Sequence, residues 1–205
     1  MWRLNGMMTY EIVKYRELSN LQKKEMIEIF IDGFGHLMTF TKDRSILGEL
    51  FFHAINEDYV YACVEENKVL GFVGIATNRI RPIKLNEEVC MKLFGKTKGS
   101  IICKQMNAIF QSKVVKKDTD LYIDVLATAK AERGKGIGTK LLEYCFALPE
   151  YENYYIEVLS KNTNAKALYE KLGFSIVKIQ YISFISLIGF GYPIKMMYMD
   201  VTSAF

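Results

Sequence analysis

The sequence predicts an α/β fold in which helices flank a mixed and strongly twisted β-sheet. From residue 121 onward the chain alternates between strand-like and helix-like segments, which predicts parallel neighbouring strands joined by a helical crossover. Residues 59–64 and 69–77 are β-branched and aromatic runs joined by a polar link at 65–68, a pattern typical of an antiparallel hairpin. The sheet is therefore expected to contain both kinds of pairing.

A first strand and two helices are expected before the hairpin. Residues 9–13 alternate polar and apolar side chains as a strand does. Ser19 stands where an N-cap is expected, before an amphipathic helix. A second amphipathic segment covers about residues 42–56, and either Thr41 or Asp43 marks its start.

The segment 80–117 departs from this regular order. Residues 87–94 and 100–110 have helical patterns, and Gly95 and Gly99 lie between them. We interpret 80–117 as a helical insertion that packs on one edge of the sheet.

The C-terminal part of the chain supplies the other elements of a sheet of about seven strands. A strand at 121–128 leads through a glycine-rich turn into a helix. After it we expect helix 136–146, strand 154–159, helix 164–172, and strands 174–181 and 195–201. A chain of 205 residues is long enough for one buried core, so a single domain over residues 1–205 is expected.

Composition excludes several classes of protein. Half of the residues are hydrophobic, which is an ordinary globular balance. Lys and Arg outnumber Asp and Glu by 27 to 23, and this net charge of +4 suits a polyanionic small molecule but is too weak to indicate nucleic acid. The four cysteines lack the spacing of a zinc site and the density of a disulfide scaffold, so we expect no metal and a cytoplasmic protein. No signal peptide or membrane-spanning run is visible, so no integral membrane segment is expected.

The motif that carries chemistry is a glycine-rich turn between a strand and a helix. Residues 132–142 read Glu-Arg-Gly-Lys-Gly-Ile-Gly-Thr-Lys-Leu-Leu. The first amides of a helix lack intrahelical partners and carry the positive end of its dipole, and glycines let an anion approach them closely. Arg133, Lys135 and Lys140 add positive charge nearby. The turn therefore predicts a phosphate-binding site.

The spacing of this turn excludes two common phosphate-binding loops. A P-loop needs a glycine followed by Lys and then Ser or Thr, whereas Gly138 is followed by Thr139 and then Lys140. The dinucleotide fingerprint would need a third glycine where Thr139 stands. A turn that merely joins a strand to a helix stays open as the structural alternative.

The remaining pattern, Arg133-x-x-Gly136-x-Gly138, resembles the pyrophosphate-binding motif of the GNAT superfamily of acyl-CoA N-acyltransferases, Arg/Gln-x-x-Gly-x-Gly/Ala. A second element lies downstream, where residues 162–174 read Asn-x-x-Ala-x-x-Leu-Tyr-Glu-Lys-Leu-Gly-Phe and are similar to another signature of that family. The close resemblance covers about residues 121–177. It implies a GNAT-like sheet that splays between its fourth and fifth strands and opens a V-shaped cleft for the cofactor.

The resemblance also implies which residues bind acetyl-CoA, the expected co-substrate. Main-chain groups of the splayed strand would pair with the pantetheine arm, and the amide of about Leu126 would polarise the thioester carbonyl. Asn162 would contact the pantetheine arm, or else would only cap a helix. The cofactor-binding set implied in this way is Leu126, Ala127, Thr128, Arg133, Gly134, Lys135, Gly136, Ile137, Gly138, Thr139, Asn162 and Tyr169.

Catalysis of acyl transfer needs an acid and a base. By the resemblance Tyr169 would lie near the reacting sulfur and protonate the leaving thiolate, although a buried tyrosine is also compatible with simple packing. Asp124 and Glu157 lie on adjacent predicted strands near the cleft and are the candidate bases, although strand carboxylates usually point to water. His36, in a glycine-containing loop, is a candidate for the lining of the acceptor pocket.

We therefore expect an N-acetyltransferase that transfers an acetyl group directly from acetyl-CoA to a primary amine in a ternary complex. The amine acceptor, a small molecule or a peptide, is not identified by the sequence. One alternative is a non-catalytic acyl-CoA-binding or sensing module. Another is an enzyme at a membrane edge, suggested by the apolar segment 179–194, whose aromatic hairpin is also a candidate surface for a homodimer.

Overall fold

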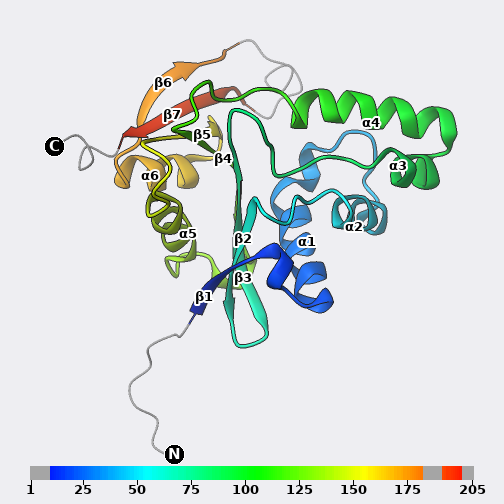
Figure 1. Cartoon of the computed structure of the whole chain (residues 1–205), viewed down its shortest axis with the longest axis horizontal. Helices are drawn as coiled ribbons and strands as arrows, with labels where there is room; N and C mark the ends of the chain where they lie inside the picture. Colours follow the sequence, from blue (N-terminus) through cyan, green and yellow to red (C-terminus); the bar gives the residue numbers. More distant parts are fainter. Residues whose placement is uncertain (1–9, 182–190, 200–205) are drawn as a thin grey trace, which may run out of the picture.

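The computed structural model describes residues 10–181 and 191–199, which form a mixed sheet flanked by helices (Figure 1). The seven strands have the order β1-β2-β3-β4-β5-β7-β6, and only the β4–β5 pair is parallel. Their bounds are β1 Tyr10–Lys14, β2 Val60–Glu65, β3 Lys68–Ala76, β4 Asp120–Thr128, β5 Asn153–Leu159, β6 Ser175–Ile179 and β7 Pro193–Met199. The predicted mixed sheet and its parallel pair are confirmed.

The helices begin where the sequence places capping residues. Ser19 accepts a hydrogen bond from the Gln22 amide and completes a capping box, and Asp43 rather than Thr41 caps the second helix. The helices are α1 Asn20–Phe34, α2 Arg44–Phe52, α3 Glu87–Phe94, α4 Lys96–Phe110, α5 Ile137–Phe146 and α6 Thr163–Lys171, with short 3-10 turns η1 Tyr15–Glu17, η2 Gly35–Leu37 and η3 Lys130–Glu132. Both helices predicted between β3 and β4 are present, but α4 begins at Lys96 and so includes Gly99. They share the core of α1 and α2 on one face of the sheet, so the expected packing on a sheet edge was wrong.

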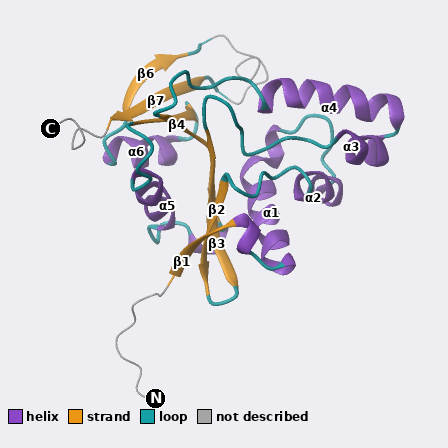
Figure 2. Ribbon diagram, in the orientation of Figure 1, coloured by secondary structure: helices purple, strands orange, loops and turns teal. Residues whose placement is uncertain are grey.

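Two hydrophobic cores lie on opposite faces of the sheet, with α1–α4 on one side and α5–α6 on the other (Figure 2). Successive residues of β2 alternate between them, because Ala62 packs toward α1 and α2 whereas Cys63 packs toward α5. Cys145, on the apolar side of α5, is fully buried in the second core. Each face is therefore covered, and the site must lie at an interruption of the sheet.

That interruption is the divergence of β4 from β5. The two strands pair only from Asp120 to Ile123 on β4, although both continue well beyond this point. At the same place the β3–β4 register shifts, because Ile75 faces Ile123 while Gly74 faces Val125, which leaves Asp124 as the extra residue of a bulge. Bulges bend a strand and increase its twist, so the bulge accounts for the predicted splay between the fourth and fifth strands.

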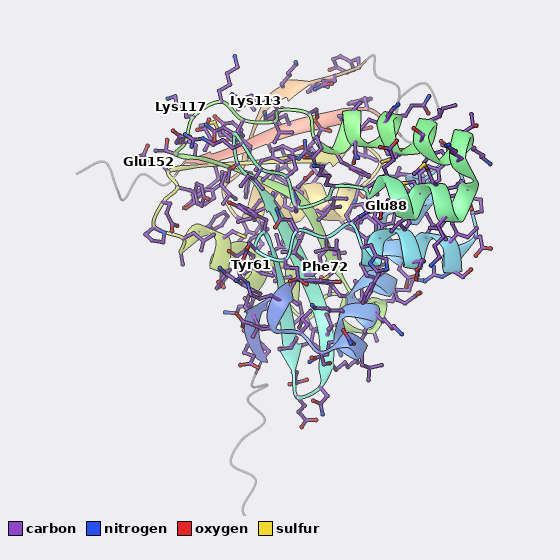
Figure 3. All side chains as sticks on the ribbon, turned by 45° about the vertical axis from the view of Figure 1, so that its right-hand side comes forward. Tyr61, Phe72, Glu88, Lys113, Lys117 and Glu152 are labelled. Carbon is purple, nitrogen blue, oxygen red and sulfur yellow. The ribbon has the colours of Figure 1, made fainter. Side chains whose placement is uncertain are left out.

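Helices α3 and α4 cross closely at Gly99. A Cβ atom on Gly99 would lie 2.4 Å from the Cys90 carbonyl oxygen and 2.6 Å from the Met91 Cα atom. From the end of α4 the chain returns to β4 along residues 111–119, which we call the strap, and the labelled Lys113 and Lys117 lie on it (Figure 3). The strap crosses the sheet above Tyr122, where Val115 is buried against that ring.

Replacing Gly99 with alanine is expected to destabilise the protein by about 1–3 kcal/mol, because the methyl group meets backbone and forces α3 and α4 apart. Urea unfolding measures the change in the free energy of unfolding. The control is Lys104→Ala on the exposed face of the same helix, which should change it by less than about 0.5 kcal/mol. Equal stability of both variants would show that the crossing relaxes freely.

No helix in residues 10–181 or 191–199 is long and apolar enough to span a bilayer. The apolar side chains of Phe184 to Phe190, on which the membrane-edge alternative rests, lie outside the described residues. Tyr192 is described, and its ring packs 4.9 Å from that of Tyr181.

Candidate active site

A cleft of about 1110 Å³ opens where β4 and β5 part. One wall is β4 from Tyr122 to Leu126, and the other is β5 from Ile156 to Leu159. The end of α1, the end of α4 with the strap, α6 and the β6–β7 pair close its sides. Asp124, Glu157, Asn162 and Tyr169, which come from three separate elements, all line this one cavity.

The edge of β4 presents unpaired backbone to the cleft. The Ala129 amide donates to the Leu70 carbonyl of β3, so Ala129 faces β3. Because the backbone groups of successive strand residues point to opposite sides, Thr128 and Leu126 face the gap left by β5, whereas Ala127 faces β3. This arrangement can accept an extended ligand as an added strand.

The glycine-rich turn follows directly on that edge. Gly134 and Gly136 have φ values of +77° and +85°, which disfavour any residue with a side chain, and the space on their open side is empty to 4 Å. Gly136 caps α5 without a side-chain hydrogen bond. Within the described part of the chain, four amides at the start of α5 have no hydrogen-bond acceptor, namely those of Gly136, Ile137, Gly138 and Thr139. The turn therefore keeps its donors available for an anion.

The cations around the turn are not equivalent. Lys135 pairs with Glu132 at 2.8 Å, and Glu132 also binds Lys68 at 2.9 Å. These two ammonium groups hold the pKa of the Glu132 carboxyl below its usual range. Lys140 pairs with Glu143 of its own helix. Arg133 has no carboxylate partner among the described residues, and its Nε lies 3.5 Å from the Thr128 carbonyl oxygen.

Helix α6 brings Asn162 and Tyr169 to the same cleft. Asn162 is an exposed residue and the N-cap of α6, because its Oδ1 accepts from the Ala165 amide. Tyr169 is only 6% exposed, and its ring packs against Phe174 at 5.9 Å. Burial raises the pKa of the Tyr169 phenol, so the hydroxyl stays protonated at neutral pH.

The two candidate bases differ in their surroundings. Asp124 is bound by Arg81 through two hydrogen bonds of 2.8 Å, and the two side chains are 12% and 10% exposed. Burial raises the pKa of Asp124, while the Arg81 guanidinium opposes that shift. Arg81 also donates to the Ser112 carbonyl, so the pair fastens the strap to β4. Asp124 is thus engaged in a structural ion pair.

Glu157 makes no hydrogen bond or ion pair with any described residue. Burial raises the pKa of its carboxyl, and the nearby Lys195 ammonium partly offsets the shift. A partly desolvated carboxylate without a partner in a cleft has the properties of a general base. His36 also lines the cleft, at η2.

The sequence did not predict several side chains at the cleft, among them those of Arg81, Lys195 and Tyr122. Arg81 and Lys195 line the cavity, and so does Tyr122, whose phenol pKa is raised by burial and by Glu157. Arg81 lies in the loop after β3, and Lys195 lies on the last strand. No local pattern connects either of them to the motif of residues 132–142.

Comparison with known proteins agrees with this geometry. The model of the acetyltransferase (GNAT) family matches residues 23–174, which is most of the chain. No curated protein sequence matches the chain significantly.

Several solved structures share the fold. An N-acetyltransferase from Staphylococcus aureus Mu50 has a TM-score of 0.62 at 18% identity, over 92% of this chain and 100% of that one. A GNAT-family acetyltransferase from Bacillus cereus ATCC 10987 has a TM-score of 0.56 at 15% identity, over 94% and 99%. A chain of the NatC complex bound to Gag peptide and CoA has a TM-score of 0.55 at 16% identity, over 94% and 98%.

The matched residues contain the splayed strands, the turn with unpaired amides and the helix that carries Tyr169. The chain belongs to the GNAT acetyltransferase family.

Proposed function

We propose that the protein is an N-acetyltransferase that moves the acetyl group of acetyl-CoA directly to a primary amine in a ternary complex. Two observations carry the proposal, namely the unpaired amides at the turn that follows β4 and the unpaired carboxylate of Glu157 in the cleft between β4 and β5. The unpaired amides suit a diphosphate, and the carboxylate of Glu157 suits an amine.

The residues present fit coenzyme A. Amides at the start of α5 would bind the diphosphate together with Arg133, and the open side of Gly136 leaves room for it. Lys135 is held by Glu132, so its role is to neutralise that carboxylate beside the phosphates. The gap-facing backbone of Leu126 and Thr128 would pair with the pantetheine arm.

The reaction needs three proton transfers. Glu157 accepts a proton from the ammonium group of the acceptor and passes it to solvent, and the neutral nitrogen then attacks the thioester carbonyl carbon. The new N–C bond forms, the Leu126 amide stabilises the oxyanion, the nitrogen loses its second proton to water, and the C–S bond breaks. Tyr169 donates its phenolic proton to the departing thiolate and recovers a proton from solvent. Asp124 takes no part, because Arg81 occupies both of its oxygens.

Replacing Tyr169 with phenylalanine is expected to lower kcat by about 10- to 100-fold and to leave coenzyme A affinity within about twofold, because only the hydroxyl is removed from a buried ring. Steady-state thiol release and calorimetry with coenzyme A measure the two quantities. Tyr144→Phe on α5, whose ring packs with Tyr61 outside the cleft, is the control. Unchanged turnover would remove the acid role from Tyr169.

The experiment that tests the proposed function is acetyl-CoA turnover with a panel of amines, followed by mass detection of the acetylated product. Saturable, amine-dependent thiol release supports it. Tight binding of coenzyme A with no turnover for any amine contradicts it and leaves a non-catalytic acyl-CoA-binding module.

A further inference from the structure

A row of charged side chains crosses the sheet at the floor of the cleft. Glu157 of β5 is directly paired with Lys195 of β7, and Lys195 is in turn paired with Lys178 of β6. All three line the cavity. Neighbouring strands are about 4.8 Å apart, so the row places the Cα atoms of one acidic and two basic residues at successive strand spacings.

Glu157 and Lys195 stand side by side and yet make no ion pair. The Lys195 ammonium donates instead to the Val114 carbonyl of the strap, at 2.8 Å, and lies 4.8 Å from the centre of the Tyr155 ring. Partial burial lowers the pKa of this ammonium. An ammonium has three donors, so two remain for a ligand. A partly desolvated ammonium that makes no ion pair is unfavourable. A ligand carboxylate that pairs with the Lys195 ammonium would remove this unfavourable free energy and would bind more tightly for that reason.

The balance of charge in the cleft is positive. Arg81 is neutralised by Asp124, which leaves Glu157 as the one carboxylate of the described cleft residues without a cationic partner. Three lysines that line the same cavity, Lys113, Lys178 and Lys195, have no carboxylate partner within the described residues. Such a field repels polycationic acceptors and attracts an anionic group attached to the amine.

We propose that the acceptor is a small zwitterionic amine of the amino-acid type, whose ammonium is bound by Glu157 and whose carboxylate is bound by Lys195, with Lys178 behind it. This inference rests on the proposed acetyl transfer and gives its substrate class. The amine and the anion lie a few bonds apart in such a molecule, which matches one to two strand spacings. Lys195 is then a specificity-determining residue, and polyamines are excluded.

The test compares acceptors that differ only in the anion. Thiol release is measured with glycine, β-alanine and 4-aminobutyrate, with the corresponding amides, and with spermidine. The expected result is that at least one amino acid exceeds its own amide by about 10-fold or more in kcat/KM, because an amide cannot make the charge-assisted contact. Equal rates for an amino acid and its amide, or preference for spermidine, overturn the inference.

Substitution of Lys195 tests whether this residue binds the carboxylate of the acceptor. Lys195→Met is expected to lower kcat/KM for the preferred amino acid by about 10- to 100-fold, mainly through KM, and to lower it for the amide by a much smaller factor that reflects only the changed pKa of Glu157. Lys195→Arg should restore part of the loss. Lys116→Met, on the exposed strap outside the cavity lining, controls for general charge. Equal loss for the amino acid and the amide would assign Lys195 a structural role and overturn the inference. If Lys195→Met does not fold, Lys178→Met must show the smaller loss of the same kind.

A binding measurement separates this inference from the proposed function. Calorimetry of the amino acid is done with the wild-type protein saturated with coenzyme A, and then with Lys195→Met. Binding that is lost in the variant supports the anion site even if no acetylation occurs, in which case only the transfer reaction is overturned. If amino acids and their amides are acetylated equally well, only the anion site is overturned.

Discussion

The Glu157→Gln variant is expected to lose about 10²- to 10⁴-fold in kcat, because glutamine keeps the shape of the side chain but cannot accept a proton. Coenzyme A affinity should stay within about twofold, since Glu157 lies on β5 and the glycine-rich turn follows β4. Steady-state kinetics with the best acceptor, together with calorimetry, measure both. The control is Glu152→Gln, an exposed carboxylate in the turn just before the same strand (Figure 3).

The pH profile gives a second signature of the base. Burial raises the pKa of Glu157 above the usual glutamate value of 4.5, so the acid limb of kcat should lie at a higher pH than an exposed glutamate would give. Turnover falls as the pH drops through that pKa, because the protonated carboxyl cannot accept a proton. In Glu157→Gln this limb should disappear from the residual activity.

The Glu157→Gln variant should lose activity without losing stability. A pKa that is raised in the folded state means that folding favours the protonated form, so this group contributes stability below its unfolded pKa and loses it as the pH rises through the folded pKa. At neutral pH the ionised Glu157 is therefore unfavourable for folding. Glu157→Gln should have an equal or higher melting temperature at pH 7. A variant that is both inactive and less stable would indicate a structural role and argue against the base.

The helix starts and the glycine-rich turn were predictable because their signals are local. Ser19 and Asp43 mark helix starts through hydrogen bonds to amides two or three residues away, and these bonds are present. The turn from Arg133 to Thr139 is likewise a contiguous pattern between a strand and a helix. Short-range backbone chemistry of this kind can be read without tertiary structure.

The acceptor side of the cleft was not predictable because its contacts join distant parts of the chain. Arg81 and Asp124 are 43 residues apart, and Lys195 and Val114 are 81 residues apart. The sequence offered Asp124 and Glu157 as equal candidates, and only the partner from the loop after β3 distinguishes them. The bulge at Asp124 also depends on the register with β3, which no local pattern of β4 encodes.

Replacing Gly136 with valine is expected to weaken coenzyme A binding by about 100-fold or more. Its φ of +85° is a genuine outlier for a β-branched residue, so the backbone must leave this conformation or bear strain of about 1–3 kcal/mol. Either response changes the direction of the Ile137 and Gly138 amides, so that they no longer point at the same bound anion. Calorimetry with coenzyme A measures the loss of affinity.

Gly95 provides the matched control for backbone strain. It also has a positive φ, +83°, and an open Cβ direction, but it joins α3 to α4 and not β4 to α5. Gly95→Val should therefore lower stability at least as much as Gly136→Val while leaving coenzyme A affinity within about threefold, because strain alone does not reach the turn. A comparable loss of affinity in both variants would mean that general destabilisation accounts for the effect.

A comparison of acetyl-CoA with S-acetylpantetheine tests whether the turn binds the diphosphate. S-acetylpantetheine retains the thioester and the arm that would pair with β4, but it lacks the diphosphate. If the amides after Gly136 bind that diphosphate, Gly136→Val lowers kcat/KM for acetyl-CoA and leaves the slower reaction of S-acetylpantetheine nearly unchanged. If the turn merely joins β4 to α5, both substrates must lose activity in the same proportion, because the variant would then disturb the whole cleft and not one contact with phosphate.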